Sequence, residues 1–360
     1  MNPQLVINLE KLRKNVQFLT AELKANQLSI MAVTKVHGAD AHIVKLFEDF
    51  PEITYLGDSR LKNIKSYHQS MKQKVLIRIP MPSEVDEVVQ VTDMSFNSEI
   101  TTIRLLNEAA KKAQKKHRIL LMVDLGDLRE GIFLESELLN VVGEVVKMAH
   151  IELMGLGVNL TCYGAIIPDE ENLQQLVAYQ QQVRTVFNLE LPLISGGNSS
   201  SLYLLDDDAH TMPKGITNLR IGEAFFTGGE TAHGKQYDLM FDDVLTLQAE
   251  IIELKEKPSV PIGQRGIDAF GQVPQFIEKG NRLKGIVALG RQDIVLDGIF
   301  PVDVDLALLG ASSDHLIIDF TEAKKNYQVG DVVTFKLNYG GMLAAFTSPY
   351  VNRVYVGEVT

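Results

Sequence analysis

Residues 29–47, SIMAVTKVHGADAHIVKLF, hold a short apolar run and then an amphipathic pattern. The run SIMAVT (29–34) has the length and composition of a buried β-strand. In residues 40–49, apolar side chains recur three and four positions apart, which predicts a helix. This stretch is therefore one βα unit, and the fold depends on how often the unit recurs.

The same alternation continues to about residue 235. We count eight candidate strands, and a helix-competent segment follows each of them except the last. The strands are SIMAVT (29–34), ITYL (53–56), VLIRI (75–79), TDMSF (92–96), RILLMVDL (118–125), IELMGLGV (151–158), LPLIS (191–195) and LRIGEAFF (219–226). The helical patterns cover residues 40–49, 60–69, 83–89, 98–116, 135–147 and 170–186. Eight consecutive βα units favour a (β/α)8 TIM barrel over an open doubly wound sheet.

The helical periodicity ends near residue 236. The later segments are strand-like and separated by Gly, Asp and Asn: VLTLQAEIIEL (244–254), NRLKGIVAL (281–289), DIVLDG (293–298), HLIIDF (315–320), DVVTFKLNY (331–339) and YVNRVYVGEV (350–359). We therefore predict a barrel domain over residues 1–235 and a smaller, mostly β domain over residues 236–360. The segment LVINL (5–9) predicts an extra strand, so residues 1–9 could belong to either domain.

Composition excludes several classes of function. The chain has 46 Asp and Glu against 35 Lys and Arg, a formal net charge of −11, whereas nucleic-acid and anionic-membrane surfaces need clustered positive charge. The single cysteine, Cys162, excludes a disulfide framework and a multi-cysteine metal site. No basic-then-apolar leader opens the chain, and no apolar run is long enough to span a membrane. We expect a soluble cytoplasmic protein.

In a barrel, catalytic groups collect where the strands end. Lys35 directly follows the first strand. Burial at that position would lower the pKa of its amine and favour a neutral nucleophile that can form a Schiff base. The other interpretation, which stays open from this residue alone, is a lysine that reaches solvent where the strand ends.

Polar side chains also follow the fifth and sixth strands. They are Asp124, Asp127 and Arg129 after the fifth strand, and Asn159, Thr161, Cys162 and Tyr163 after the sixth. Arg129 could simply pair with a neighbouring aspartate, and a lone cysteine is more often inert packing than a nucleophile. Both groups of residues are candidates for one rim of the barrel.

The segments after the last two strands predict a phosphate site. The seventh strand is followed by GGNSSS (196–201), which includes Ser199 and Ser200, and the eighth predicted strand itself contains Arg220, Gly222 and Glu223. Glycines and hydroxyls at a helix start supply backbone and side-chain donors to a phosphate, although a capped helix without a ligand has the same pattern. Together with a lysine at the first strand, a phosphate site here indicates pyridoxal phosphate.

Five segments of the barrel, AVTKVHGAD, LMVDLGDLREGIF, GLGVNLTCYG, SGGNSSSL and NLRIGEAFFTGGET, resemble the alanine racemase-like, fold-type III pyridoxal-phosphate enzymes, and most of all their ornithine racemase branch. Later segments such as PIGQRGIDAFG, ALGRQD, LLGASSDHLIIDF and TSPYVNRVY resemble the same branch. The resemblance implies a pyridoxal-phosphate-dependent amino-acid racemase that removes and returns the Cα proton.

The resemblance also implies residue roles. Lys35 matches the lysine that binds the cofactor covalently and serves as one acid/base. The expected cofactor contacts are Arg129 at the phenolic oxygen, Asn159 in place of a histidine near the ring, Ser199 and Ser200 at the phosphate, the amides of Gly222 and Glu223, Arg220 at the pyridine nitrogen, and Tyr350 at the phosphate, with Tyr339 as its competitor. A cationic arginine at the ring nitrogen weakens the electron sink, which favours simple proton transfer at Cα.

Racemisation needs a second group on the opposite face of the substrate. In alanine racemases, a tyrosine from the partner's β domain has this role, and Phe270 occupies its place here. We predict that Asp268 substitutes, on the assumption that the two residues share one face of a strand, with Tyr163 as the second choice. Arg291, Ser313 and Asp314 match positions that approach the neighbouring site, and either bind substrate or form surface turns. The resemblance therefore implies a homodimer with shared active sites.

The substrate and two other functions stay open. A basic amino acid such as ornithine fits the resemblance, and Asp314, Asp268 or Glu223 could bind its ω-ammonium; alanine or serine are alternatives. A non-catalytic pyridoxal-phosphate carrier protein would consist of the barrel alone, whereas this chain continues with the β domain predicted over residues 236–360. D-threonine aldolase-like or D-serine dehydratase-like enzymes generally need a metal, and the eight histidines are scattered, at positions 37, 42, 68, 117, 150, 210, 233 and 315, so we predict no metal site.

Overall fold

The computed structural model describes residues 3–206 and 211–357. The chain forms two compact units: Lys11–Asp242 is one, and Met1–Glu10 joins Asp243–Thr360 in the other. The second unit thus contains the first strand, β1 (Gln4–Asn8), as well as the C-terminal third of the chain.

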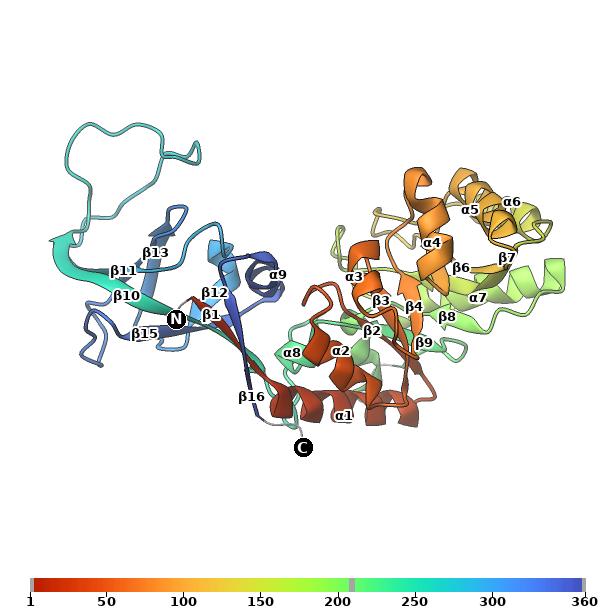
Figure 1. Ribbon diagram of the computed structural model, residues 1–360, viewed down its shortest axis with the longest axis horizontal. Helices are drawn as coiled ribbons and strands as arrows, with labels where there is room; N and C mark the ends of the chain where they lie inside the picture. Colours follow the sequence, from red (N-terminus) through yellow and green to blue (C-terminus); the bar gives the residue numbers. More distant parts are fainter. Residues whose placement is uncertain (1–2, 207–210, 358–360) are drawn as a thin grey trace. The chain divides into compact units, whose positions relative to one another are not determined.

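The first unit is a closed barrel of parallel strands surrounded by helices (Figure 1). Its strands are β2 (Ser29–Val33), β3 (Ile53–Asp58), β4 (Gln73–Leu76), β5 (Met94–Asn97), β6 (His117–Val123), β7 (Ile151–Val158), β8 (Leu193–Ser195) and β9 (Asn218–Ile221). They follow chain order around the barrel, and β9 pairs with β2 to close it. The predicted (β/α)8 barrel is confirmed.

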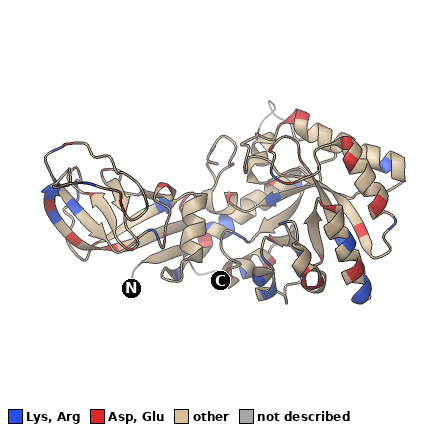
Figure 2. Cartoon of the chain, turned by 90° about the horizontal axis from the view of Figure 1, so that it is seen from above, with Lys and Arg blue, Asp and Glu red and all other residues tan. Residues whose placement is uncertain are grey.

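Amphipathic segments between the strands form the outer layer. The helices are α1 (Leu9–Ala25), α2 (Ala41–Glu48), α3 (Leu61–Ser66), α4 (Val85–Val91), α5 (Ile100–Lys112), α6 (Glu135–Val145), α7 (Glu170–Phe187) and α8 (Ala224–Thr227), with short 3-10 segments η1 (Pro82–Glu84) and η2 (Ser199–Leu205). Local chemistry fixes their ends: Asp169 caps α7 by accepting from Asn172 N at 2.7 Å, and Asn188 ends it in the left-handed region. Acidic and basic positions are interspersed over these outer helices (Figure 2).

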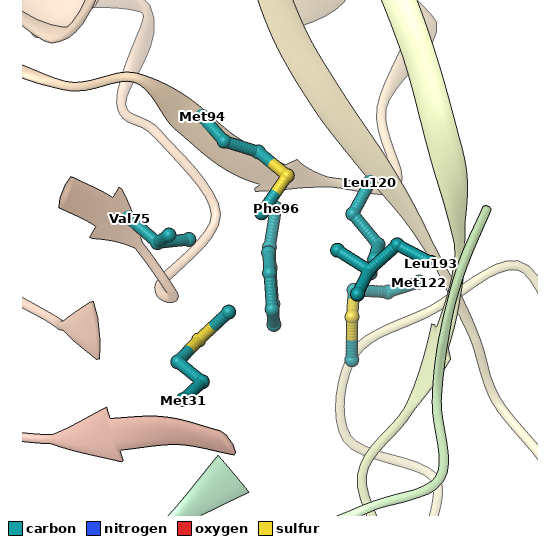
Figure 3. Close-up of a cluster of buried hydrophobic side chains, with 7 residues drawn as sticks. All are labelled: Met31, Val75, Met94, Phe96, Leu120, Met122 and Leu193. Carbon is teal, nitrogen blue, oxygen red and sulfur yellow. The ribbon is translucent and has the colours of Figure 1, made fainter. Parts of the chain in front are cut away.

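Large apolar side chains fill the inside of the barrel. They are Met31, Val75, Met94, Phe96, Leu120, Met122 and Leu193 (Figure 3). Tyr55, Ile77, Ile79 and Met154 pack against them. Because parallel strands are covered on both faces, they read as continuous apolar runs, as β6 (HRILLMV) does. This core fills the inside of the barrel beneath the C-terminal ends of its strands.

The second unit is a largely antiparallel sheet. Its strands run in the order β12 (Ile299–Pro301), β15 (Val332–Leu337), β10 (Leu245–Pro258), β11 (Asn281–Val287), β14 (Leu316–Asp319) and β13 (Ala307–Ala311). The strand β1 pairs antiparallel with β10 and parallel with β16 (Asn352–Val356). A long excursion, residues 259–280, leaves the sheet between β10 and β11 (Figure 1). The mostly β character expected for this region is confirmed.

Four details of the expected elements are wrong. The predicted strand at residues 293–298 is a turn that ends in a 3-10 segment, η3 (Leu296–Gly298). The strand expected to reach residue 339 ends at Leu337, and α9 (Tyr339–Thr347) follows it because Asn338 caps the helix by accepting from Gly341 N at 3.0 Å. The last barrel strand ends at Ile221, before α8. Residues 266–272 form a turn and not a strand.

Within residues 3–206 and 211–357, no helix combines the length and the apolar composition that crossing a bilayer requires.

Candidate active site

A cavity of about 280 Å³ opens at the C-terminal ends of the barrel strands. Its polar lining consists of Lys35, Ser59, Arg78, Arg129, Glu130, Asn159 and Arg220, and its apolar lining of Ile77, Ile79, Phe96 and Met122. Phe96 and Met122 also belong to the barrel core, so the core forms the floor of this cavity. Four of the residues predicted from the sequence, Lys35, Arg129, Asn159 and Arg220, are therefore brought together.

Lys35 lies in the turn that leads from β2 to α2. Burial lowers the pKa of its amine; the positive charges of Arg129 and Arg220 lower it further, while Cys162 and Glu130 act in the opposite direction. A lowered pKa makes the neutral, nucleophilic amine more accessible at physiological pH.

A buried hydrogen-bond network supports the turn at Lys35. The carboxylate of Asp58, which is fully buried at the end of β3, accepts from Thr34 Oγ1 at 2.6 Å, from Arg60 N at 2.8 Å and from Asn63 Nδ2 at 3.1 Å. Burial raises the pKa of Asp58, and these donors oppose the shift. The network fixes the residue before Lys35, so the backbone that carries the amine has little freedom.

Arg220 lies at the centre of the site and is fixed by three hydrogen bonds. Its guanidinium donates to Ser195 Oγ at 2.7 Å, to Val158 O at 2.8 Å and to Asn159 Oδ1 at 2.9 Å. Complete burial lowers the pKa of Arg220 to about 10, so the side chain remains a cation at neutral pH. Its guanidinium carbon lies 5.5 Å from the centre of the Phe96 ring.

The predicted phosphate residues lie at the neighbouring strand ends. Ser199 Oγ accepts from Ala224 N at 3.3 Å, which joins the segment after β8 to the segment after β9 that contains Gly222 and Glu223. The Ser200 hydroxyl is fully buried, and its oxygen has no hydrogen-bond partner among the described residues. Burial raises the pKa of Glu223 to about 7, and the charge of Lys35 lowers it only in part.

Two loops at the rim are tied together by one carboxylate. Asp127 is buried after β6, and its oxygens accept from the backbone N–H groups of Tyr163 at 3.0 Å, Gly164 at 3.1 Å and Ile166 at 3.4 Å. The Tyr163 side chain itself is 74% exposed and does not line the cavity. The bonds therefore fix the loop that carries Arg129 against the loop that carries Cys162 and Tyr163.

The remaining predicted residues belong to the second unit. Asp268 Oδ1 accepts from Phe270 N at 2.9 Å and from Gln272 N at 2.8 Å, so the carboxylate forms the turn in which it lies. The assumption that Asp268 and Phe270 share one face of a strand is therefore wrong. Tyr350 is 60% exposed, and Tyr339 is the first residue of α9.

Arg291 organises the surroundings of Phe270 within the second unit. Its guanidinium carbon lies 4.1 Å from the centre of the Phe270 ring, and its Nε donates to Ala311 O at 2.9 Å. The backbone N of Arg291 donates to Ser312 O at 2.9 Å, next to the hydrogen bond between Ser313 and Asp314. Arg291 thus joins Phe270 to the turn that carries Ser313 and Asp314.

Two charged residues of the cavity were not predicted from the sequence. Arg78 interrupts the apolar run VLIRI and donates to Glu84 Oε1 at 2.5 Å and to Ser59 O at 3.0 Å. Glu130 follows Arg129 directly and accepts from its guanidinium. A charge inside an apolar strand was the available signal for Arg78, whereas nothing in the sequence distinguishes Glu130 from a solvent-exposed loop residue.

No group of three or more His, Cys, Asp or Glu side chains within the described ranges could hold a metal ion. His210, one of the eight histidines, lies outside those ranges.

Comparison with known proteins gives consistent results across the whole chain. Residues 7–229 match the family model described as alanine racemase, N-terminal domain. An ornithine racemase of Acetoanaerobium sticklandii is 46% identical over 353 residues, which covers 98% of this chain and 99% of the relative. A lysine racemase of Thermotoga maritima is 35% identical over 355 residues, 98% of each chain.

Solved structures share the fold at low sequence identity. Alanine racemase from Bartonella henselae with covalently bound pyridoxal phosphate has a TM-score of 0.75 at 17% identity and covers 99% of this chain and 100% of that one. A D-threonine aldolase from Filomicrobium marinum has a TM-score of 0.74 at 13% identity, covering 96% and 89%. Because aldolase and racemase structures both match, this likeness shows the fold alone.

Proposed function

The chain belongs to the alanine racemase family, and on that premise we propose that it is a pyridoxal-phosphate-dependent racemase of a basic amino acid, with ornithine as the first substrate to test. The observation that carries the proposal is Lys35, a lysine of lowered pKa in a cavity that also holds a fixed cationic Arg220. The full-length similarity to an ornithine racemase and a lysine racemase supports the substrate class.

The residues present fit the cofactor. The cavity has an excess of cationic side chains, which suits a phosphorylated aldehyde and a substrate carboxylate. The buried Ser200 hydroxyl and the buried Nδ2 of Asn159 have no hydrogen-bond partner among the described residues, so each has capacity for a ligand. Lys35 would hold the aldehyde carbon, Ser199, Ser200 and the amides of Gly222 and Glu223 the phosphate, and Arg129, Asn159 and Arg220 the ring.

When bound, pyridoxal phosphate withdraws electrons from the substrate and acidifies its Cα–H bond. Lys35 Nζ takes the Cα proton from one enantiomer, and in the reverse reaction it delivers a proton to that same face. Burial lowers the pKa of its amine, which favours the neutral form that can accept the proton. Arg220 stays charged and is held by Ser195, Val158 and Asn159, so it orients the ring without giving up a proton.

We further propose that Asp268 moves the proton on the opposite face, with Tyr163 as the second choice. The two backbone N–H groups that bind Asp268 Oδ1 leave Oδ2 available for proton transfer. In the Asp268→Asn variant, we expect one enantiomer to keep Cα exchange and the other to lose it. Unchanged exchange from both enantiomers would exclude Asp268.

A homodimer whose β domains complete each other's active sites is also part of the proposal, as is Tyr350 as a phosphate contact. The loop 259–280 supports the dimer, because it exposes large apolar side chains such as Ile262 and Ile277, which are 90% and 75% exposed. The cytoplasmic location remains a prediction from the sequence.

The decisive experiment is incubation of the cofactor-loaded protein with single L-amino acids in D2O. We expect loss of optical rotation with deuterium at Cα for ornithine or lysine, and slower reaction of alanine and serine. Lys35→Ala should lower the exchange rate by more than about 10³-fold and abolish the visible absorbance of the bound cofactor. Retained absorbance and exchange in this variant would refute the cofactor assignment, and the exposed Lys45→Ala variant on α2 is the control.

A further inference from the structure

Glu130 is the one acidic side chain among the described residues that line the cavity. It lies between cations: Arg129 donates to both of its oxygens, with Nη2 at 2.6 Å from Oε1, and its charge acts on Lys35 and Arg220. Its side chain is 20% exposed, so it faces the cavity and not open solvent. A carboxylate in this position would repel a phosphate or a substrate carboxylate, so it is not suited to bind either of them.

The other carboxylates at this end of the barrel already have partners. Asp124 Oδ1 accepts from Gly126 N and Leu128 N, and Asp127 accepts from three amides of the next loop. Glu84 accepts from Arg78 and from Met81 N. Glu223 stands beside the predicted phosphate residues, and burial disfavours its charge.

The surroundings of Glu130 suit the end of a basic side chain. A carboxylate has about four acceptor sites, so the pair with Arg129 leaves room for a further donor. The cavity walls include Ile77, Ile79 and Met122, against which methylene groups can pack. The cavity that contains Lys35 thus offers apolar surface for methylene groups and a carboxylate to receive a positive charge.

We propose that Glu130 binds the ω-ammonium group of the substrate and is the residue that selects basic amino acids. This inference rests on the proposed function and differs from the sequence-based candidates for this contact, Asp314, Asp268 and Glu223. Arg129 holds the Glu130 side chain in place and so acts as a positioning residue for the subsite.

The test compares ornithine with norvaline, which has the same carbon skeleton without the terminal amine. In Glu130→Gln, kcat/KM for ornithine should fall by about 10- to 100-fold, as for loss of a charge-assisted contact, while kcat/KM for norvaline changes by less than about 3-fold. Binding is read independently with α-methylornithine and α-methylnorvaline, which have no Cα proton, by calorimetry. The exposed Glu135→Gln variant at the start of α6 is the matched control and should behave as the wild type.

Glu130→Asp gives a second measurement that does not depend on the Gln variant folding. The aspartate keeps the charge but withdraws it by one methylene, so the preference should move from ornithine toward lysine, whose side chain is one methylene longer. The inference is overturned if Asp leaves the ratio unchanged, if Gln lowers ornithine and norvaline turnover equally, or if Asp314→Asn alone removes the preference. A wild-type protein that racemises no basic amino acid refutes the proposed function itself.

Discussion

Glu223 shows how one residue can couple the site to pH. Burial raises the pKa of this carboxyl from its ordinary value of 4.5 to about 7. Between these values, the folded protein holds a proton at Glu223 that the unfolded chain has lost, so this group makes the fold less stable as the pH rises. The register of β2 with β9 explains why Lys35 opposes the shift, since the two residues follow neighbouring strands.

We therefore predict that Glu223→Gln flattens the pH dependence of stability. In cofactor-free protein, the difference in Tm between variant and wild type should grow in favour of the variant from pH 4.5 to 7, by on the order of 2–4 °C. Thermal unfolding followed by circular dichroism across this range measures the difference. A constant difference would show that Glu223 titrates normally, and the exposed Glu135→Gln variant controls for loss of a surface charge.

At the scale of elements, the loops after β6 and β7 act as one unit because Asp127 joins them. Gly131 is needed in the same region: it has φ +135°, and a Cβ there would lie 2.4 Å from Asp124 N. The loop returns so closely that Val123 and Ile132 form a bridge. Arg129 and Glu130 thus project from a tightly folded segment, not from a loose loop.

Removing the Asp127 carboxylate should loosen both loops. We predict that Asp127→Ala lowers the free energy of unfolding by about 3 kcal/mol, since three N–H groups lose a charged acceptor, and also lowers cofactor affinity through Arg129. Denaturant titration and cofactor titration by absorbance measure the two effects. Asp169→Ala, which removes a cap on α7, should lower stability by about 1 kcal/mol and leave cofactor affinity unchanged. Equal cofactor affinity in both variants would contradict the role of Asp127.

Some elements of the structure could be predicted from the sequence and others could not. The eight barrel strands could be predicted because each is a short, mostly apolar segment that alternates with helical patterns. Lys35 and Arg220 could be predicted because a charge directly after or within such a segment is conspicuous. The helix α9 could not, because YGGMLAAFT contains two glycines and lacks a polar face, and its formation depends on the cap by Asn338 and on burial of Met342 and Phe346. Glu130 could not be distinguished either, since its role depends on where the loop folds in space.

At the scale of the whole molecule, the proposal of shared active sites predicts complementation between inactive variants. Lys35→Ala and Asp268→Asn homodimers should both fail to racemise. In a heterodimer, one of the two sites recovers both wild-type residues, so purified heterodimers should have about half of the wild-type activity. Activity of tagged, purified heterodimers measures this. If verified heterodimers stay inactive, the two residues do not act across a dimer.

The strand β1 has a consequence for how the protein is made. It lies between β10 and β16 in the sheet of the second unit, although α1 and the entire barrel follow it in the chain. During synthesis, the barrel segment emerges as one continuous stretch and can fold early, whereas β1 must wait until β10 and then β16 leave the ribosome. The strand β1 is therefore translated before the barrel strands but paired after them, and its unpaired edge is exposed while the barrel is synthesised.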